Sequence, residues 1–120
     1  MFRNKPNIVI TGGTRGLGFY TAKYLSKLGC NLIIIDISPG ACAVYKESKS
    51  LKEVQSKLSN NNSVNFYFGD LTKEKEVKTI FAKIKKKHKT IDGLVTFAGG
   101  DISGKTQKPQ VERQKRIIYL

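Results

Sequence analysis

The sequence predicts a three-layer α/β fold, with helices on both faces of a parallel sheet. Short apolar runs alternate with segments of helical periodicity along most of the 120 residues. One run, residues 32–35, is apolar throughout, which is typical of a parallel strand covered on both faces. We therefore expect the order β-α-β-α-β-α-β, with right-handed crossovers and with the first strand in the centre of the sheet.

The first half of the chain contains two expected strands and the helix that joins them. The strands cover residues 7–11 and 31–36, and the helix covers residues 16–28. The helix is predicted from side chains that recur at helical spacing: Leu17, Tyr20, Thr21, Tyr24, Leu25 and Leu28. Gly29 is typical of a helix stop, and Ser-Pro-Gly at residues 38–40 predicts a turn.

The second half predicts two further helices and two further strands. A helix over residues 43–58 has one apolar face: Val44, Leu51, Val54 and Leu58. A strand over residues 64–68 follows, and we expect Thr72 to cap a third helix. The inward side chains of that helix are expected to be Val77, Ile80, Phe81 and Ile84. A last strand over residues 91–98 gives a sheet truncated after about four strands.

Composition limits the classes of function. Residues 1–100 suffice for one domain, whereas residues 101–120 are expected to form an irregular basic tail. Two interpretations of this tail stay open: an aberrant product of a truncation or a frameshift, and part of a genuine short protein. Lys and Arg outnumber Asp and Glu by 22 to 9, for a net charge of +13. The densest lysines, within residues 83–89, fall at an expected helix end, where cations are favoured, and no Phe, Tyr or Trp lies among them. We therefore interpret the charge as a solvated surface, with nucleic-acid binding as the less favoured alternative.

Other classes are excluded by what the sequence lacks. The two cysteines have no Cys-x-x-Cys spacing and there is a single histidine, so we expect neither a disulfide framework nor a metal site. No apolar stretch approaches the roughly 20 residues that span a bilayer, and no signal-peptide pattern precedes the first strand. We therefore expect a cytoplasmic protein with no membrane partner.

Residues 11–18, which read Thr-Gly-Gly-Thr-Arg-Gly-Leu-Gly, are the most informative stretch of the chain. Glycine permits tight turns and lets the backbone approach a ligand closely, because it has no Cβ. A glycine-rich turn between a strand and a helix presents backbone N–H groups at the positive end of the helix dipole. An acidic residue, Asp36, ends the next expected strand. This context predicts a site for the pyrophosphate of a dinucleotide.

Four ordered motifs resemble the short-chain dehydrogenase/reductase family over residues 7–100. They are the Gly12-x-x-x-Gly16-x-Gly18 spacing after Thr11, Asp36 after the second strand, Asp-Leu-Thr at residues 70–72, and Asp-Gly-Leu-Val-Thr-Phe-Ala-Gly at residues 92–99. The resemblance implies a Rossmann-like sheet and a cofactor site made of Thr11, Gly12, Thr14, Arg15, Gly16, Leu17, Gly18, Asp36, Asp70, Leu71, Ala98 and Gly99. In that family the glycine turn holds the pyrophosphate, and the position of Asp36 binds the adenosine ribose. The positions of Asp70 and Leu71 meet the adenine edge, and those of Ala98 and Gly99 line the cofactor.

The expected cofactor is NAD, with NADP as the alternative. A carboxylate at Asp36 accepts from a ribose 2′-OH and repels a 2′-phosphate, which favours NAD. Arg15 favours NADP, because relatives with a basic residue before the second motif glycine often bind it. The sequence departs from the family at Thr96-Phe97, where an Asn-Asn pair is usual. Phe97 cannot make the hydrogen bonds of the second asparagine.

The chain contains no expected catalytic residue. The family uses a serine and a Tyr-x-x-x-Lys pair on a later helix, where the tyrosine transfers a proton and the lysine lowers its pKa. Tyr45 and Lys49 have this spacing but fall too early in the chain, so we interpret them as a coincidence. The sequence thus predicts the cofactor-binding fragment of an NAD(P)-dependent oxidoreductase, whose full-length form would act on an alcohol or ketone. The alternative is a non-catalytic nucleotide-sensing or interaction module. In either case the unfilled sheet edge beyond the fourth strand predicts self-association.

Overall fold

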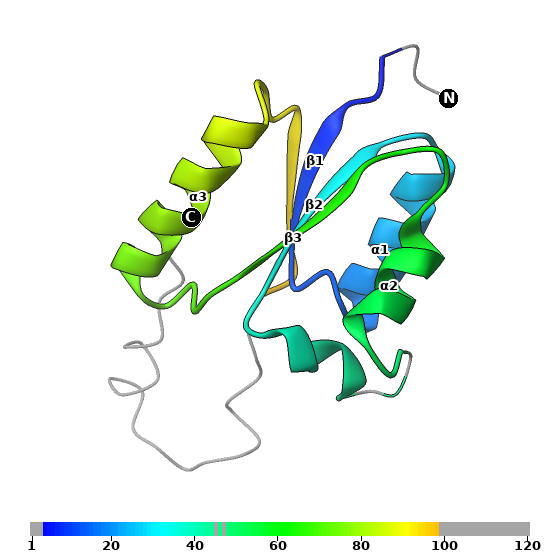
Figure 1. Ribbon diagram of the computed structural model, residues 1–120, viewed down its shortest axis with the longest axis horizontal. Helices are drawn as coiled ribbons and strands as arrows, with labels where there is room; N and C mark the ends of the chain where they lie inside the picture. Colours follow the sequence, from blue (N-terminus) through cyan, green and yellow to red (C-terminus); the bar gives the residue numbers. More distant parts are fainter. Residues whose placement is uncertain (1–3, 45, 47, 99–120) are drawn as a thin grey trace.

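The computed structural model describes residues 4–44, 46 and 48–98, which form a parallel sheet between two layers of helix (Figure 1). Its four strands are β1 (Asn7–Thr11), β2 (Asn31–Asp36), β3 (Val64–Phe68) and β4 (Gly93–Thr96). They lie in the order β3-β2-β1-β4, and every neighbouring pair is parallel. The predicted α/β class and the predicted central position of the first strand are therefore confirmed. The predicted tail, residues 101–120, lies outside the described residues.

Three α-helices cover the sheet. α1 (Gly16–Lys27) and α2 (Leu51–Leu58) lie on one face, and α3 (Glu74–Lys87) lies on the other (Figure 1). A short 3-10 helix, η1 (Pro39–Ala43), follows β2. Each face has its own hydrophobic core, one centred on Ile10, Leu32 and Ile34 and the other on Val9, Ile33 and Ile35. Because residues 32–35 are fully buried on both faces, β2 is the continuous apolar strand that the sequence predicts.

The inward face of α1 includes only part of the set that recurs at helical spacing, since Leu25 and Leu28 pack against the core. Phe19, Ala22 and Ser26 are buried, whereas the side chains of Leu17, Tyr20 and Tyr24 are 74%, 57% and 63% exposed. Both sets recur with helical spacing, so periodicity does not distinguish them. The rotation of the helix is set by Gly18, since a Cβ at this position would lie 2.0 Å from the backbone oxygen of Gly12. α1 must therefore place Gly18 against the loop after β1. In this orientation Tyr20 and Tyr24 lie on the solvent side of the helix. The last predicted residue, Leu28, is the C-cap.

The second helix begins later than predicted. Residues 39–43 form η1, Lys46 has a φ of 63°, and Val44 is 56% exposed. α2 begins at Leu51, where Ser50 is the N-cap and its hydroxyl accepts from the backbone N–H of Glu53. The Glu53 carboxylate in turn accepts from the backbone N–H of Lys49. This reciprocal arrangement resembles a capping box, whose Ser-x-x-Glu spacing is present in the sequence.

The ends of the third helix and fourth strand also differ slightly from expectation. The N-cap of α3 is Lys73, and the side chain and backbone N–H of Thr72 bond instead to the carboxylate of Asp70. The inward face of α3 is confirmed, because Val77, Ile80 and Ile84 are buried and Phe81 packs against them while partly exposed. β4 covers Gly93–Thr96, shorter at both ends than the predicted strand.

Candidate functional site

The candidate site lies where the carboxyl ends of β1, β2 and β4 meet. β1 is hydrogen-bonded to β2 on one side and to β4 on the other. The chain therefore adds β2 and β3 on one side of β1 and then crosses to add β4 on the other side, so the strand order reverses here. In open α/β sheets, ligands bind in the crevice outside such a topological switch point. The turn between β1 and α1, residues 12–15, occupies this position.

Gly12 of this turn and Gly18 of α1 are required by close backbone contacts. Gly12 has a φ of +72°, and a Cβ there would lie 2.9 Å from the backbone nitrogen of Ala98 and 3.0 Å from the carbonyl carbon of Phe97. Gly18 lies against Gly12 itself, at a distance that excludes any side chain. Gly16, the first residue of α1, has a φ of +58°, in the left-handed region that favours glycine. The glycine spacing therefore brings β1, α1 and the end of β4 into backbone contact.

Gly13 belongs to the glycine-rich stretch of residues 11–18 but is not among the predicted cofactor-binding residues. A Cβ at Gly13 would lie 2.8 Å from the Cγ2 atom of Ile34 and 3.2 Å from that of Ile10. The turn therefore packs directly on the hydrophobic core. The sequence shows Gly13 as an additional glycine between Gly12 and Gly16, but its partner Ile34 lies on another strand, which the spacing does not reveal.

Thr11 connects β1 to the end of β4. Its carbonyl oxygen accepts from the backbone N–H of Phe97 at 2.9 Å, and its hydroxyl accepts from the backbone N–H of Ala98 at 3.2 Å. Thr11 is fully buried, and Ala98 is partly buried. The structure thus assigns Thr11 a positioning role, because it holds Ala98 beside the glycine turn. Phe97, the departure from the family pattern, is 40% exposed. Gly99 lies outside the described residues.

Asp36 connects β2 to the same turn. One carboxylate oxygen, Oδ2, accepts from the backbone N–H of Thr14 at 3.1 Å and from its hydroxyl at 2.6 Å. The other oxygen, Oδ1, accepts from the backbone N–H of Ile37 at 2.8 Å. Asp36 is 6% exposed and Thr14 is fully buried. A carboxylate has about four acceptor sites, and these bonds occupy three of them.

The N-terminus of α1 faces the turn without any acidic group. Arg15 is the N-cap, with an extended backbone, and its side chain makes no capping hydrogen bond. No acidic residue lies in the first turn of the helix. The first N–H groups of a helix and its dipole favour negative charge, which no acidic side chain of the first turn supplies here. An anion such as a phosphate suits this position.

Asp70 and Leu71 have local roles in the structure. The Asp70 carboxylate accepts from Thr72, and the backbone N–H of Asp70 donates to Glu76 at 2.9 Å. The side chain of Leu71 is 6% exposed and belongs to the core beneath α3. These contacts shape the turn between β3 and α3, and the contact of both residues with an adenine stays a prediction.

No catalytic or metal centre is found among residues 4–44, 46 and 48–98. Within these ranges no group of three His, Cys, Asp or Glu side chains could hold a metal ion. Tyr45 lies outside the described residues, Lys46 has a left-handed backbone, and Lys49 precedes the first residue of α2. Burial raises the pKa of the Cys30 and Cys42 thiols, which makes both poor nucleophiles. None of the helices described is long and apolar enough to cross a bilayer.

Comparison with known proteins identifies the family. The family model described as short chain dehydrogenase matches residues 6–120. This chain belongs to the short-chain dehydrogenase family. The family resemblance drawn from the glycine turn, Asp36, Asp70 and the end of β4 is thereby confirmed, and the family is one of NAD(P)-dependent oxidoreductases.

Curated relatives and solved structures show the same relationship. Human 3-hydroxyacyl-CoA dehydrogenase type-2 is 37% identical over 98 residues, which cover 82% of this chain and 33% of that protein. Human polyprenol dehydrogenase is 34% identical over 94 residues, which cover 76% of this chain and 26% of that protein. A short-chain dehydrogenase/reductase structure from Sinorhizobium meliloti 1021 has a TM-score of 0.67 at 25% identity, covering 85% of this chain and 43% of that one. An NADH-dependent reductase, A1-R′, complexed with NAD has a TM-score of 0.67 at 24% identity, covering 81% and 37%. The chain thus spans about a third or less of the length of these two curated relatives.

Proposed function

We propose that this short-chain dehydrogenase chain binds an NAD(P) dinucleotide across the turn between β1 and α1. The observation that carries the proposal is the close approach of Gly18 to Gly12, next to a helix N-terminus without an acidic residue in its first turn. Gly12, Gly16 and Gly18 have no side chains, so a pyrophosphate can approach the N-terminus of α1 closely, where the helix dipole favours negative charge. When bound, the nicotinamide supplies the hydride chemistry of the family.

The proposed contacts follow the order of the motifs. Gly12, Gly16, Leu17 and Gly18 hold the pyrophosphate, and the carboxylate of Asp36 binds the adenosine ribose. Thr11 and Ala98, which the structure joins by a hydrogen bond, form the wall next to β4. The further proposed contacts are those of Thr14, Arg15, Asp70, Leu71 and Gly99.

NAD is the proposed cofactor, with NADP as the alternative. The Asp36 carboxylate is fixed by Thr14 and Ile37, so it cannot rotate away from a 2′-phosphate without losing those hydrogen bonds. Two like charges at close range repel most strongly in a partly buried site. Arg15, at the N-cap of α1, is the residue that would support NADP.

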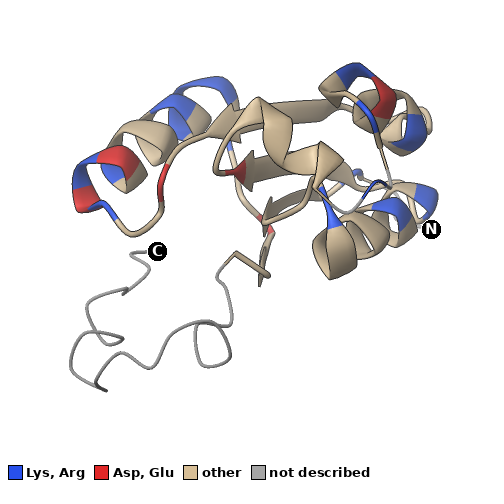
Figure 2. Ribbon diagram, turned by 90° about the horizontal axis from the view of Figure 1, so that it is seen from below, with Lys and Arg blue, Asp and Glu red and all other residues tan. Residues whose placement is uncertain are grey.

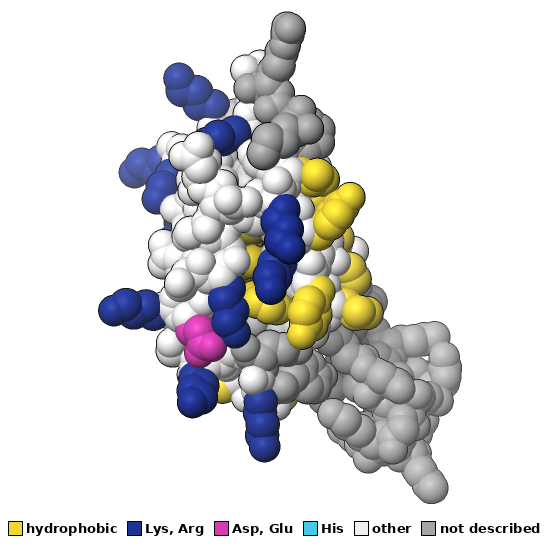
Figure 3. Space-filling view, turned by 90° about the vertical axis from the view of Figure 1, so that its right-hand side faces the viewer, with side chains coloured by type: hydrophobic (Ala, Val, Ile, Leu, Met, Phe, Trp, Pro, Cys, Tyr) yellow, Lys and Arg dark blue, Asp and Glu magenta, His cyan; other side chains and the backbone are white. Residues whose placement is uncertain are grey.

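Hydride transfer between the nicotinamide and an alcohol or ketone is proposed for a longer form of the protein, because the serine, tyrosine and lysine of the family do not occur at matching positions here. Apolar side chains are exposed on α1 and around β4: Leu17, Tyr20, Tyr24, Ile91, Leu94 and Phe97. Figure 3, which views the side that carries α1 and α2 in Figure 1, shows hydrophobic side chains gathered there. We propose that further chain packs on these two surfaces in a longer form, and that copies of the present chain associate through the sheet edge beyond β4 and through the exposed face of α1.

A non-catalytic nucleotide-sensing module is the second candidate. It is favoured by the two separate hydrophobic cores, which cover both faces of the sheet within the described residues. Such a module needs the same cofactor site but no catalytic group. A cytoplasmic location is part of both proposals, because Cys30 and Cys42 are buried free thiols, as suits a reducing compartment.

Calorimetric titration with NADH and NADPH tests the proposed cofactor site. Gly12→Ala places a methyl group in backbone contact with Ala98, and we expect it to abolish binding of either dinucleotide. Gly29→Ala is the matched control, since Gly29 has a comparable positive φ of +92° but open space around its Cβ position. It should carry similar backbone strain and still bind. Equal binding by the two variants, or no binding by the unmodified chain while circular dichroism shows it folded, would overturn the proposal.

A further inference from the structure

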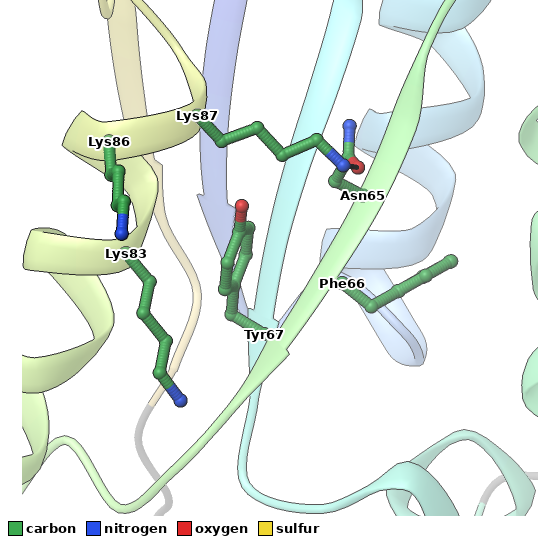
Figure 4. A pocket seen from close by; sticks show the side chains of 6 residues that line it. All are labelled: Asn65, Phe66, Tyr67, Lys83, Lys86 and Lys87. Atoms are coloured by element: carbon green, nitrogen blue, oxygen red, sulfur yellow. Dashed lines mark hydrogen bonds between the residues drawn. The ribbon is translucent and has the colours of Figure 1, made fainter.

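The free edge of β3 adjoins a basic hollow that the cofactor proposal does not use. The hollow has a volume of about 420 Å³ and lies between β3 and the last turns of α3 (Figure 4). It is lined by Asn65, Phe66, Tyr67, Lys83, Lys86 and Lys87. β3 ends the strand order on this side, at the opposite edge from β4. The hollow is separate from the glycine turn, since β2 lies between β3 and β1 and none of the residues that line the hollow belongs to the turn.

The backbone groups at this edge alternate in direction. The Ser63 carbonyl oxygen accepts from Leu32, and the Gly69 N–H donates to the Asp36 carbonyl, so both residues turn their backbone groups towards β2. Because a strand alternates with a period of two, Asn65 and Tyr67 also face β2. The N–H and C=O groups of Val64, Phe66 and Phe68 therefore point outwards, where an added strand would pair with them.

The side chains next to this edge are strongly positive. Lys83 and Lys86 are exposed, and the Lys87 ammonium donates to the Asn65 side chain at 2.7 Å. Figure 4 shows these three lysines and Tyr67 on the same side of β3, with Phe66 pointing to the other side. The acidic residues of α3 lie in its first turn, at the opposite end of the helix (Figure 2). Among the described residues, those two acids pair with Lys73 and Lys78 rather than with a lysine of the hollow.

We propose that the β3 edge binds an extended acidic peptide segment as an additional strand. Outward backbone groups at the edge supply the main-chain hydrogen bonds of strand addition. Side chains of an added strand point to alternate faces, so every second residue lies on the α3 side, facing Lys83 and Lys86. The complementary ligand therefore carries Asp or Glu at alternate positions. A second copy of this basic chain does not fit, because its own lysines would be placed opposite these.

The same geometry favours a peptide over a single-stranded nucleic acid. Nucleic-acid platforms combine positive charge with exposed aromatic faces on which bases stack. Here Phe66 packs against the core beneath α1 and α2, and the Tyr67 hydroxyl lies 3.3 Å from the Nε2 atom of His88. The outward N–H and C=O groups of β3 both have matching partners on a peptide backbone, whereas a deoxyribose–phosphate chain offers acceptors for the N–H groups but no donor for the C=O groups.

Two isomeric peptides and one variant pair test this proposal with the full chain. The probes are a blocked ten-residue peptide of alternating Glu and Thr, its isomer with five Glu followed by five Thr, and a deoxythymidine ten-mer. We expect the alternating peptide to bind more tightly than its isomer and the nucleic acid in fluorescence anisotropy. Lys86→Glu should weaken it by about tenfold, the sum of a lost attraction and a new repulsion at an exposed site. Lys85→Glu is the matched control, because Lys85 lies in the same helical turn but outside the hollow.

Amide hydrogen exchange distinguishes strand addition from diffuse charge attraction. On binding, the amides of Phe66 and Phe68 should become protected, whereas those of Asn65 and Tyr67 should change little. Val64→Pro removes one outward N–H at the first residue of the strand, where proline is tolerated, and should weaken the alternating peptide while leaving thermal unfolding cooperative. Each of four outcomes would overturn the proposal. They are equal losses from Lys85→Glu and Lys86→Glu, equal binding of the two peptide isomers, tighter binding of the nucleic acid, and absence of peptide binding.

Discussion

The Thr14 hydroxyl donates a 2.6 Å hydrogen bond to the Asp36 carboxylate, and both side chains are buried. The two residues are 22 positions apart, on the glycine turn and at the end of β2. The bond therefore fixes the turn against the sheet before any cofactor binds. It also orients the carboxylate that we propose as the ribose ligand, so one contact serves both the fold and the site.

Thr14→Val removes this hydroxyl while keeping the shape of the side chain. A hydrogen bond to a charged group contributes about 1.5–3 kcal/mol, so we expect the free energy of unfolding to fall by that amount. Thr14→Ser retains the hydroxyl and should lose less. Urea denaturation of the three proteins measures the difference. If the valine and serine variants were equally destabilised, the loss would come from packing rather than from the bond to Asp36.

Asp36→Asn tests the choice between NAD and NADP. Removing the carboxylate charge removes its repulsion of a 2′-phosphate, so the affinity ratio of NADH to NADPH should fall by about tenfold, or ~1.4 kcal/mol. Asp92→Asn is the charge-matched control, because Asp92 accepts from the backbone N–H of Asn7 at the opposite end of the sheet. Calorimetric titration gives both ratios. An unchanged ratio in the Asp36 variant would show that Asp36 does not select the cofactor.

His88 makes the stability of the fold dependent on pH. Burial, and secondarily the charge of Lys87, lowers the pKa of its imidazole below the usual 6.5. The unfolded chain therefore binds this proton at a higher pH than the folded chain does. The stability that neutral His88 contributes is fully present above the pKa that its imidazole has in the unfolded chain. This stability is lost as the pH falls from that value towards the lower pKa of the folded chain. Urea unfolding across this range should show the loss, and His88→Gln should reduce it. The same slope in both proteins would exclude His88 as its source.

Three strands and the glycine turn could be predicted from the sequence because their signals are local. The strands Asn7–Thr11, Asn31–Asp36 and Val64–Phe68 have the predicted bounds, since each is a short run bounded by Gly, Asn, Pro or Asp. The helical spacing predicts α1 but does not show which of its faces is buried, because two sets of side chains fit one helical period. The contact between Gly18 and Gly12 decides between them, and periodicity carries no information about it.

The candidate site was predictable as a set of positions but not as a set of contacts. The glycine spacing indicates where an anion can approach, because the requirement for glycine is visible in the residues themselves. The bond between Thr14 and Asp36 and the bonds of Thr11 to Phe97 and Ala98 join different strands. They depend on strand order and register, which single-sequence patterns do not specify. The bonds of Asp70, by contrast, are local, because its carboxylate accepts from Thr72 two residues later in the same turn.

The exposed face of α1 predicts that the isolated chain associates. Tyr20 and Tyr24 are 57% and 63% exposed on the side of the helix that no described element covers closely. We expect the double substitution Tyr20→Gln and Tyr24→Gln to shift the chain towards monomer in sedimentation velocity experiments, because it removes contiguous apolar surface.

The stability of that double variant should change by no more than about 0.5 kcal/mol per site, as is usual for exposed positions. Val44→Gln is the control, since Val44 is 56% exposed but follows η1 rather than lying on α1. It should leave the sedimentation profile unchanged. If the unmodified chain were monomeric, or if the Val44 variant shifted equally, the α1 face would not mediate association. Packing against further chain in a longer form would then be the remaining role proposed for this face.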